Sequence, residues 1–259
     1  LTSLSISGAS ILGANVTTSG TQTYGALNII NNITLTSNSG AVSLGGAVNG
    51  AATLTVNSSS NFTLSNAIGS NTALTALTIG TSSSTNNVTI SATVNVNGAI
   101  TIFGNNVTLN QDLTASSGNN VIISATGDFD NNAGSDAINV SGAGRWIVYT
   151  ANDNTAANFG SLNSNTTPIW SSTYSTLAPA SVDSGNRYVF AETATQTVTF
   201  ATTSETIIYG DSLNLSDNYS LTTSGVAGLT NVYNATASGA VISLSTVYSL
   251  NPTISISAT

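Results

Sequence analysis

Four side chains that offer oxygen ligands lie close together in one part of the chain: Asp128, Asp130, Asn132 and Asp136. Carboxylate and amide oxygens are the ligands that a hard cation such as Ca²⁺ prefers. The bidentate Glu that ends a typical calcium loop has no counterpart in this segment. We therefore expect a solvated turn here, and we keep Asp128, Asp130 and Asp136 as a candidate Ca²⁺ site. No other cofactor is predicted.

Acidic residues that could form a catalytic pair are scarce. No Asp or Glu precedes Gly104, and only Asp112 stands between Gly104 and Asp128. Acid–base cleavage of polysaccharides needs paired carboxylates on neighbouring strands, and a conventional nucleophilic triad needs a His, which the chain lacks. The sequence therefore predicts a protein that is not an enzyme and that has no catalytic residues.

The charge balance limits the partners of the chain. Arg145 and Arg187 are the only basic residues against 10 acidic ones, and the net charge is −8. Binding to nucleic acid depends on many cations that neutralise phosphates, so we expect neither nucleic acid nor an anionic membrane as a partner. No apolar run approaches the roughly 20 residues of a transmembrane helix, and we predict no membrane insertion. The absence of Cys and Met suits an oxidising, extracellular location.

Short alternating segments dominate the first half of the chain. Apolar residues two apart recur with Thr, Ser or Asn between them, as in Leu4/Ile6, Ile33/Leu35, Leu77/Ile79 and Val107/Leu109. A period of two places one face of a strand inward and the other outward. Clusters of Asn, Gly and Ser separate these segments and are typical of turns, because Gly and Asn tolerate positive φ. The pattern predicts an all-β protein without a helix of useful length.

Internal repeats distinguish between two all-β architectures. Leu1-Thr-Ser-Leu-Ser-Ile-Ser returns as Leu74-Thr-Ala-Leu-Thr-Ile-Gly, and Leu35-Thr-Ser-Asn-Ser-Gly returns as Leu113-Thr-Ala-Ser-Ser-Gly. A sandwich of antiparallel hairpins and a parallel β-helix both fit the strand pattern. Repeats favour the β-helix, or solenoid, because each position then stacks on its equivalent one coil away, and Asn, Ser and Thr at the turns form ladders. We predict a parallel β-helix over residues 1–144.

Aromatic residues concentrate after this region. Trp146, Tyr149, Phe159, Trp170 and Tyr174 follow one another closely, and large rings can close the open end of a helical core. We predict a capping coil and connector over 145–190, in which Arg145 pairs with a nearby Asp, and a separate small β-domain over 191–259. Four aromatic residues could form a platform for a sugar, although we expect them to be packed in the cap: Tyr24, Tyr149, Trp170 and Tyr174.

Several segments carry a resemblance to a known family. The run Thr18-Ser-Gly-Thr-Gln-Thr-Tyr-Gly and the turn Leu44-Gly-Gly-Ala-Val-Asn-Gly resemble the repeats of filamentous-haemagglutinin-type bacterial surface adhesins, and the block Gly144-Arg-Trp-Ile-Val-Tyr is similar to the segment that ends such repeat regions. Arg187-Tyr-Val-Phe-Ala and Tyr209-Gly-Asp are similar to the start of the glycine-rich MBG β-modules that follow such repeats. The resemblance implies a secreted, right-handed β-helical rod without enzymatic activity. The secretion domain and the anchor of that family are not seen in this sequence.

The resemblance and the exposed strand edges of a β-helix together lead to a functional expectation. Strands at the end of a solenoid pair with further strands unless they are covered. We expect Leu1, Leu4, Ile6, Ile254 and Ile256 to serve assembly, with flanking repeats or other copies of the chain as partners and glycans or a host-cell surface as possible ligands. The predicted function is a structural or adhesive fibre of a bacterial surface or biofilm matrix. The alternative is a carbohydrate-binding or carbohydrate-active β-helix.

Overall fold

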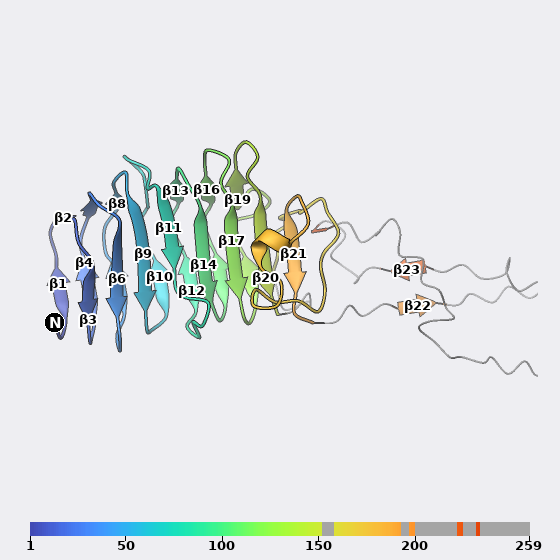
Figure 1. The fold of residues 1–259 in the computed structure, drawn as a ribbon, viewed down its shortest axis with the longest axis horizontal. Helices are drawn as coiled ribbons and strands as arrows, with labels where there is room; N and C mark the ends of the chain where they lie inside the picture. The colour runs from blue at the N-terminus through green and yellow to red at the C-terminus, as the bar shows by residue number, and fades with distance from the viewer. Residues whose placement is uncertain (152–157, 193–196, 200–221, 225–231, 234–259) are drawn as a thin grey trace, which may run out of the picture.

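The computed structural model describes residues 1–151, 158–192, 197–199, 222–224 and 232–233. Short strands stack along one long axis in this part of the chain (Figure 1). Strands of successive coils pair in parallel, so the fold is the predicted parallel β-helix and not a sandwich of antiparallel hairpins. The helical element of the described residues is a single 3-10 turn, η1 (Pro179–Ser181).

One face of the solenoid is a continuous sheet of eight strands, which we call the long sheet. At the usual spacing of about 4.8 Å between strands, eight strands extend about 34 Å along the axis. Its strands, in axial order, are β3 (Val16–Thr18), β6 (Ile33–Ser37), β9 (Thr53–Ser58), β11 (Ala76–Ile79), β14 (Ile100–Gly104), β17 (Val121–Ala125), β20 (Trp146–Thr150) and β21 (Arg187–Phe190).

Two further faces complete each coil, and each is divided into shorter sheets. The second face contains β1 (Leu4–Ile6), β4 (Gln22–Tyr24) and β7 (Val42–Leu44), followed by β10 (Phe62–Leu64), β12 (Val88–Ile90), β15 (Val107–Leu109) and β18 (Phe129–Asn131). The third face contains β2 (Ser10–Leu12), β5 (Leu27–Ile29) and β8 (Val48–Asn49), followed by β13 (Val94–Val96), β16 (Leu113–Ala115) and β19 (Ile138–Val140). Ile68 links the two parts of the third face through bridges to Val48 and Val94.

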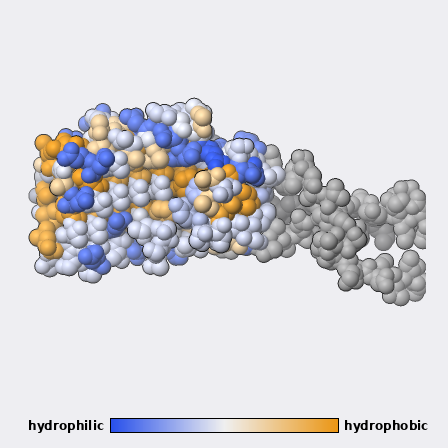
Figure 2. Space-filling view, viewed as in Figure 1, coloured by the Kyte–Doolittle hydropathy of each residue, from blue (hydrophilic) through white to orange (hydrophobic). Residues whose placement is uncertain are grey.

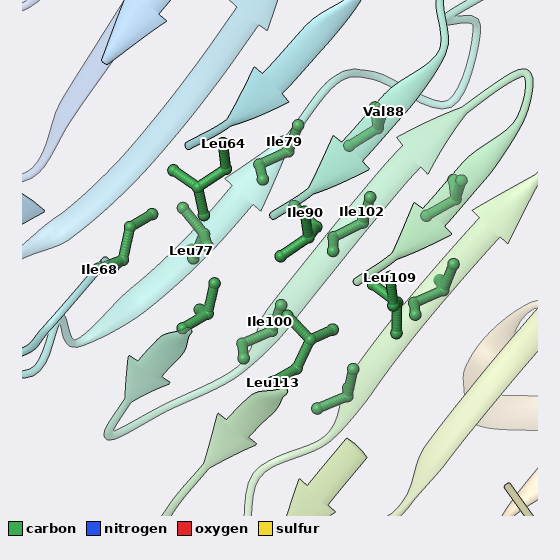
Figure 3. Close-up of a cluster of buried hydrophobic side chains, with 14 of the residues drawn as sticks. Leu64, Ile68, Leu77, Ile79, Val88, Ile90, Ile100, Ile102, Leu109 and Leu113 are labelled. Carbon is green, nitrogen blue, oxygen red and sulfur yellow. The ribbon is translucent and has the colours of Figure 1, made fainter. Parts of the chain in front are cut away.

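Aliphatic side chains from the three faces fill the interior as a continuous column (Figure 3). In the long sheet Leu77 lies in register with Leu54 and Ile100, and Ile79 lies in register with Ile102. These side chains are at most 1% exposed. The alternation seen in the sequence thus places every second residue of a strand in the column and leaves the intervening Thr, Ser and Asn outside, as predicted.

Asparagine side chains stabilise the turns between faces. The Oδ1 atom of Asn61 accepts a hydrogen bond from the backbone N–H of Asn87 at 2.9 Å, and Asn87 does the same for Asn106 at 3.2 Å. Asn106 in turn accepts from the N–H of Asp128 at 3.0 Å. Because each amide satisfies a backbone donor of the next coil, the repeated Asn residues at turns form the predicted ladder.

A polar group also lies inside the column, near its first coils. Gln22 is fully buried, and its Nε2 atom donates to the carbonyl oxygens of Thr36 at 2.7 Å and Val16 at 3.2 Å. Its Oε1 atom accepts from the hydroxyl of Tyr24 at 2.9 Å. Burial raises the pKa of Tyr24 from 10.0 to about 12, because desolvation disfavours the phenolate.

Aromatic residues pack together in the column beyond β20. Tyr188 packs edge-to-face on Trp146 and on Phe159, with ring centroids 5.0 Å apart in each pair. Trp170 stacks on Phe190 at 4.6 Å. The stacking of coils continues through this region, because β20 and β21 are the last two strands of the long sheet. Residues 145–190 therefore extend the solenoid, and their capping role stays a prediction.

Little of the predicted domain over 191–259 falls within the described residues. Strands β22 (Thr197–Thr199) and β23 (Thr222–Ser224) form an antiparallel pair. Val232 and Tyr233 are buried, and the Tyr233 ring lies 5.9 Å from that of Phe190. The assembly residues Ile254 and Ile256 lie outside the described residues.

Candidate functional site

The acidic segment runs from Asp128, directly before β18, through that strand to Asp136 in the turn that follows. Asp130 lies in β18, where its Oδ1 atom accepts from the N–H of Asn158 at 3.1 Å. Asn132 belongs to a side-chain ladder, in which it donates to Asn110 at 2.9 Å and accepts from Asn158 at 2.8 Å. Asp136 accepts a bond from Asn139 through its backbone oxygen. In the part of the chain that the structure describes, no three His, Cys, Asp or Glu residues gather as a metal site.

The guanidinium of Arg145 binds backbone carbonyl oxygens, one of which belongs to Asp183, so its contact with this Asp is made through the backbone. Its Nη2 atom donates to the carbonyl oxygens of Pro179 at 2.9 Å and Val182 at 3.0 Å, and Nη1 donates to the carbonyl oxygen of Asp183. These carbonyls stand at η1 and directly after it. The planar guanidinium, with five donors, fits such a cluster of acceptors. Arg145 therefore holds the segment that contains η1 against the solenoid.

We call residues 169–183 the strap: it starts with Ile169, which pairs with Val189 at the edge of the long sheet, and then crosses the outer face of that sheet. Ile169, Tyr174, Leu177 and Val182 of the strap pack on an outward-facing cluster of the sheet. That cluster contains Ile122, Ile147, Tyr149 and Val189, all buried. The strap thus gives the last coils of the solenoid a second hydrophobic layer outside the column.

The sequence contained a signal for this second layer. Val121-Ile-Ile and Trp146-Ile-Val-Tyr are runs of consecutive apolar residues, whereas earlier strands alternate apolar and polar ones. A strand that is apolar at every position is typically buried on both faces. Every residue of β17 and β20 is indeed buried. These consecutive apolar runs are the signal from which the outer layer could have been predicted.

The four aromatic residues considered as a sugar platform do not form one cluster, and only two of them meet. Tyr24 is buried in the column near the first coils, and Trp170 stacks on Phe190 beyond β20. Tyr149 and Tyr174 do meet on the outer face of the long sheet, with ring centroids 5.5 Å apart. Burial, and next the nearby Tyr174, raise the pKa of Tyr149 to about 12, and Arg145 acts in the opposite direction.

A cleft of about 320 Å³ opens beside this aromatic pair, between the long sheet and the strap. Ser124 and Thr126 line it from the sheet, Thr173 and Ser175 line it from the strap, and Ser82 reaches it from the loop after β11. Asp, Glu, Lys and Arg are absent from its described lining. Its residues offer hydroxyl donors and acceptors beside an aromatic wall.

Comparisons with protein-family models, curated proteins and solved structures found no match. The description of this chain therefore rests on its own residues and their arrangement.

The opposite end of the solenoid contains the three assembly residues that the structure describes. Leu1 is 74% exposed, and Leu4 and Ile6 are only half-buried although they face the column. Hydrophobic residues gather at this end in the space-filling view (Figure 2), where Ile11 is also 70% exposed. The strands β1, β2 and β3 each pair with one neighbour. Across the described ranges, no helix is long and apolar enough to cross a bilayer.

Proposed function

We propose that this chain is a rigid section of a secreted structural or adhesive fibre at a bacterial surface or in an extracellular matrix. The observation that carries the proposal is the column, in which one register of inward residues runs unbroken through the long sheet from β6 to β20. Such a column makes the rod stiff, because each coil is stabilised by its two neighbours. It also sets the length of the rod, since each coil adds about 4.8 Å.

The outer surface supports the same proposal. Outward positions of successive strands repeat the same residue type, as where Thr55, Thr78 and Thr101 lie side by side in the long sheet. Hydroxyl and amide side chains can bond to glycans or to a neighbouring rod, and a low density of charge leaves lateral association unopposed. A rod with such sides needs no deep pocket to adhere.

The end formed by β1, β2 and β3 supports association along the axis. In the described residues each of these strands pairs with one neighbour, so its other edge can accept a further strand from flanking repeats or from another copy, and Leu4 and Ile6 are only half-buried beside it. A strand edge next to exposed apolar side chains favours the addition of further strands. Addition of one rod to another at this end, in the same direction each time, would generate a filament.

Electron microscopy of the whole chain over a range of concentrations tests this proposal. We expect rods that join end to end into filaments, which lengthen as the concentration rises. Ile6→Lys places a charge at the apolar end and should shorten the filaments, whereas Thr63→Lys, at an exposed outward position of β10 away from this end, should leave them long. Circular dichroism would verify that both variants are folded. Single rods at every concentration, or equal effects of the two lysines, would contradict axial assembly.

A further inference from the structure

Three outward residues in register lie under the strap, and two of them, Ser124 and Tyr149, line the cleft. Phe103, Ser124 and Tyr149 lie side by side on β14, β17 and β20, so the serine stands between two aromatic rings. Tyr174 of the strap contacts both rings edge-to-face, with centroids 5.0 Å from Phe103 and 5.5 Å from Tyr149. Ser124 therefore forms a polar floor, and the tyrosines form an apolar wall.

Ser124 is the residue that points to a ligand. It lines the cleft, and although the residue is only 7% exposed, its hydroxyl oxygen is not among the buried atoms that lack a partner, so this hydroxyl is open to the cleft. Its neighbour at the equivalent outward position, Ile122, is packed in the apolar layer under the strap. A hydroxyl that is open to the cleft can donate a hydrogen bond to a ligand or accept one from it.

Further hydroxyl groups lie at the rim of the cleft. The hydroxyls of Thr173 and Ser175 lie 2.9 Å apart, and either can donate to the other. Ser82 reaches the rim from a loop that starts at Gly80, where φ is +75° and a Cβ would lie 2.4 Å from the carbonyl oxygen of Phe103. Glycine thus lets this loop pass close to the long sheet. Each rim hydroxyl can serve as donor or acceptor.

We infer that the cleft binds a neutral saccharide unit. The lining combines hydroxyls with two tyrosine rings and no charged side chain, which matches a ligand that has many hydroxyls, an apolar C–H face and no charge. A volume of about 320 Å³ is at the lower end of the roughly 300–1,000 Å³ typical of ligand clefts, and suits a mono- or disaccharide. The inference concerns a single copy of the chain and does not rest on fibre formation.

Saturation-transfer difference NMR on the whole chain tests the inference, with glucose, galactose, N-acetylglucosamine and lactose as separate probes. We expect saturable binding of at least one of them. Ser124→Val removes the floor hydroxyl and fills space, and Thr173→Ala removes a rim hydroxyl. Loss of one hydrogen bond predicts that each variant weakens binding by roughly three- to tenfold.

Thr101→Val is the matched control, because Thr101 is also an outward residue of the long sheet but does not line the cleft. It should bind as the unchanged chain does, and unfolding curves of all variants would verify that they are folded. The inference is overturned if no probe shows saturable binding, or if Ser124→Val binds no more weakly than Thr101→Val.

Discussion

Truncation of Ile102 should destabilise the solenoid strongly. Ile102 is fully buried in β14, with Ile79 on one side and Ile123 on the other in the same register. These two neighbours belong to adjacent coils that are themselves held by backbone pairing. The column can therefore close only partly around a shortened side chain, and Ile102→Ala leaves a cavity.

The magnitude follows from the atoms removed. Ile→Ala deletes three buried carbon atoms, which at about 0.8 kcal/mol per buried methylene is about 2.4 kcal/mol of transfer free energy. The unfilled cavity adds to this, so we expect a loss of about 2–5 kcal/mol in the free energy of unfolding. Ile102→Val deletes one carbon atom and should cost about 0.5–1.5 kcal/mol.

Urea unfolding followed by far-ultraviolet circular dichroism measures both losses. Thr101→Ala is the control, since Thr101 is the preceding residue of β14 and faces outward. We expect it to cost less than about 1 kcal/mol, the span of strand preferences. If Ile102→Ala cost no more than Thr101→Ala, the inward column would not be the source of stability, and the reasoning behind the rod would be refuted.

Two further predictions concern the strap and the buried tyrosines. Arg145→Gln removes the donors to Pro179 and Val182, so amide hydrogens of the strap should exchange about tenfold faster while those of β14 keep their rates; equal acceleration in both would mean a global effect. Burial raises the pKa of Tyr24 and of Tyr149 to about 12, whereas both pKa values lie near 10 in the unfolded chain. Above pH 10 the unfolded chain therefore releases protons that the folded chain retains. The free energy of unfolding should keep its full value below pH 10 and fall as the pH rises from 10 towards 12. Urea midpoints on either side of this window measure the effect, and an unchanged midpoint would contradict it.

Alternation was sufficient to predict the strands and their inward faces, because a period of two is a local property of the backbone. The internal repeats correctly favoured the β-helix, but the repeated segments do not stack on each other. Leu4–Ile6 and Leu77–Ile79 share a sequence pattern, yet they lie in β1 and β11, which belong to different faces. Any strand of the solenoid needs the same inward and outward pattern, so similarity between two segments does not show that they stack on each other.

The stacking partners depend on the lengths of the turns. Val88 stacks on Phe62 across a long coil that includes the loop of Ser82, whereas Val107 stacks on Val88 across a shorter one. Such insertions leave the paired strands in register because the extra residues bulge outward at a turn. A fixed repeat length in the sequence could not have identified these partners.

The cleft could not be predicted from the local sequence pattern. The sequence by itself determined an all-β chain with inward aliphatic and outward hydroxyl and amide side chains, since these depend on residues two apart. Only the tertiary structure brought Phe103, Ser124 and Tyr149 side by side and placed Tyr174 over them. The physical reason is that register across coils and the course of the strap depend on hydrogen bonds and packing between residues far apart in the chain, such as those that join Arg145 to Val182.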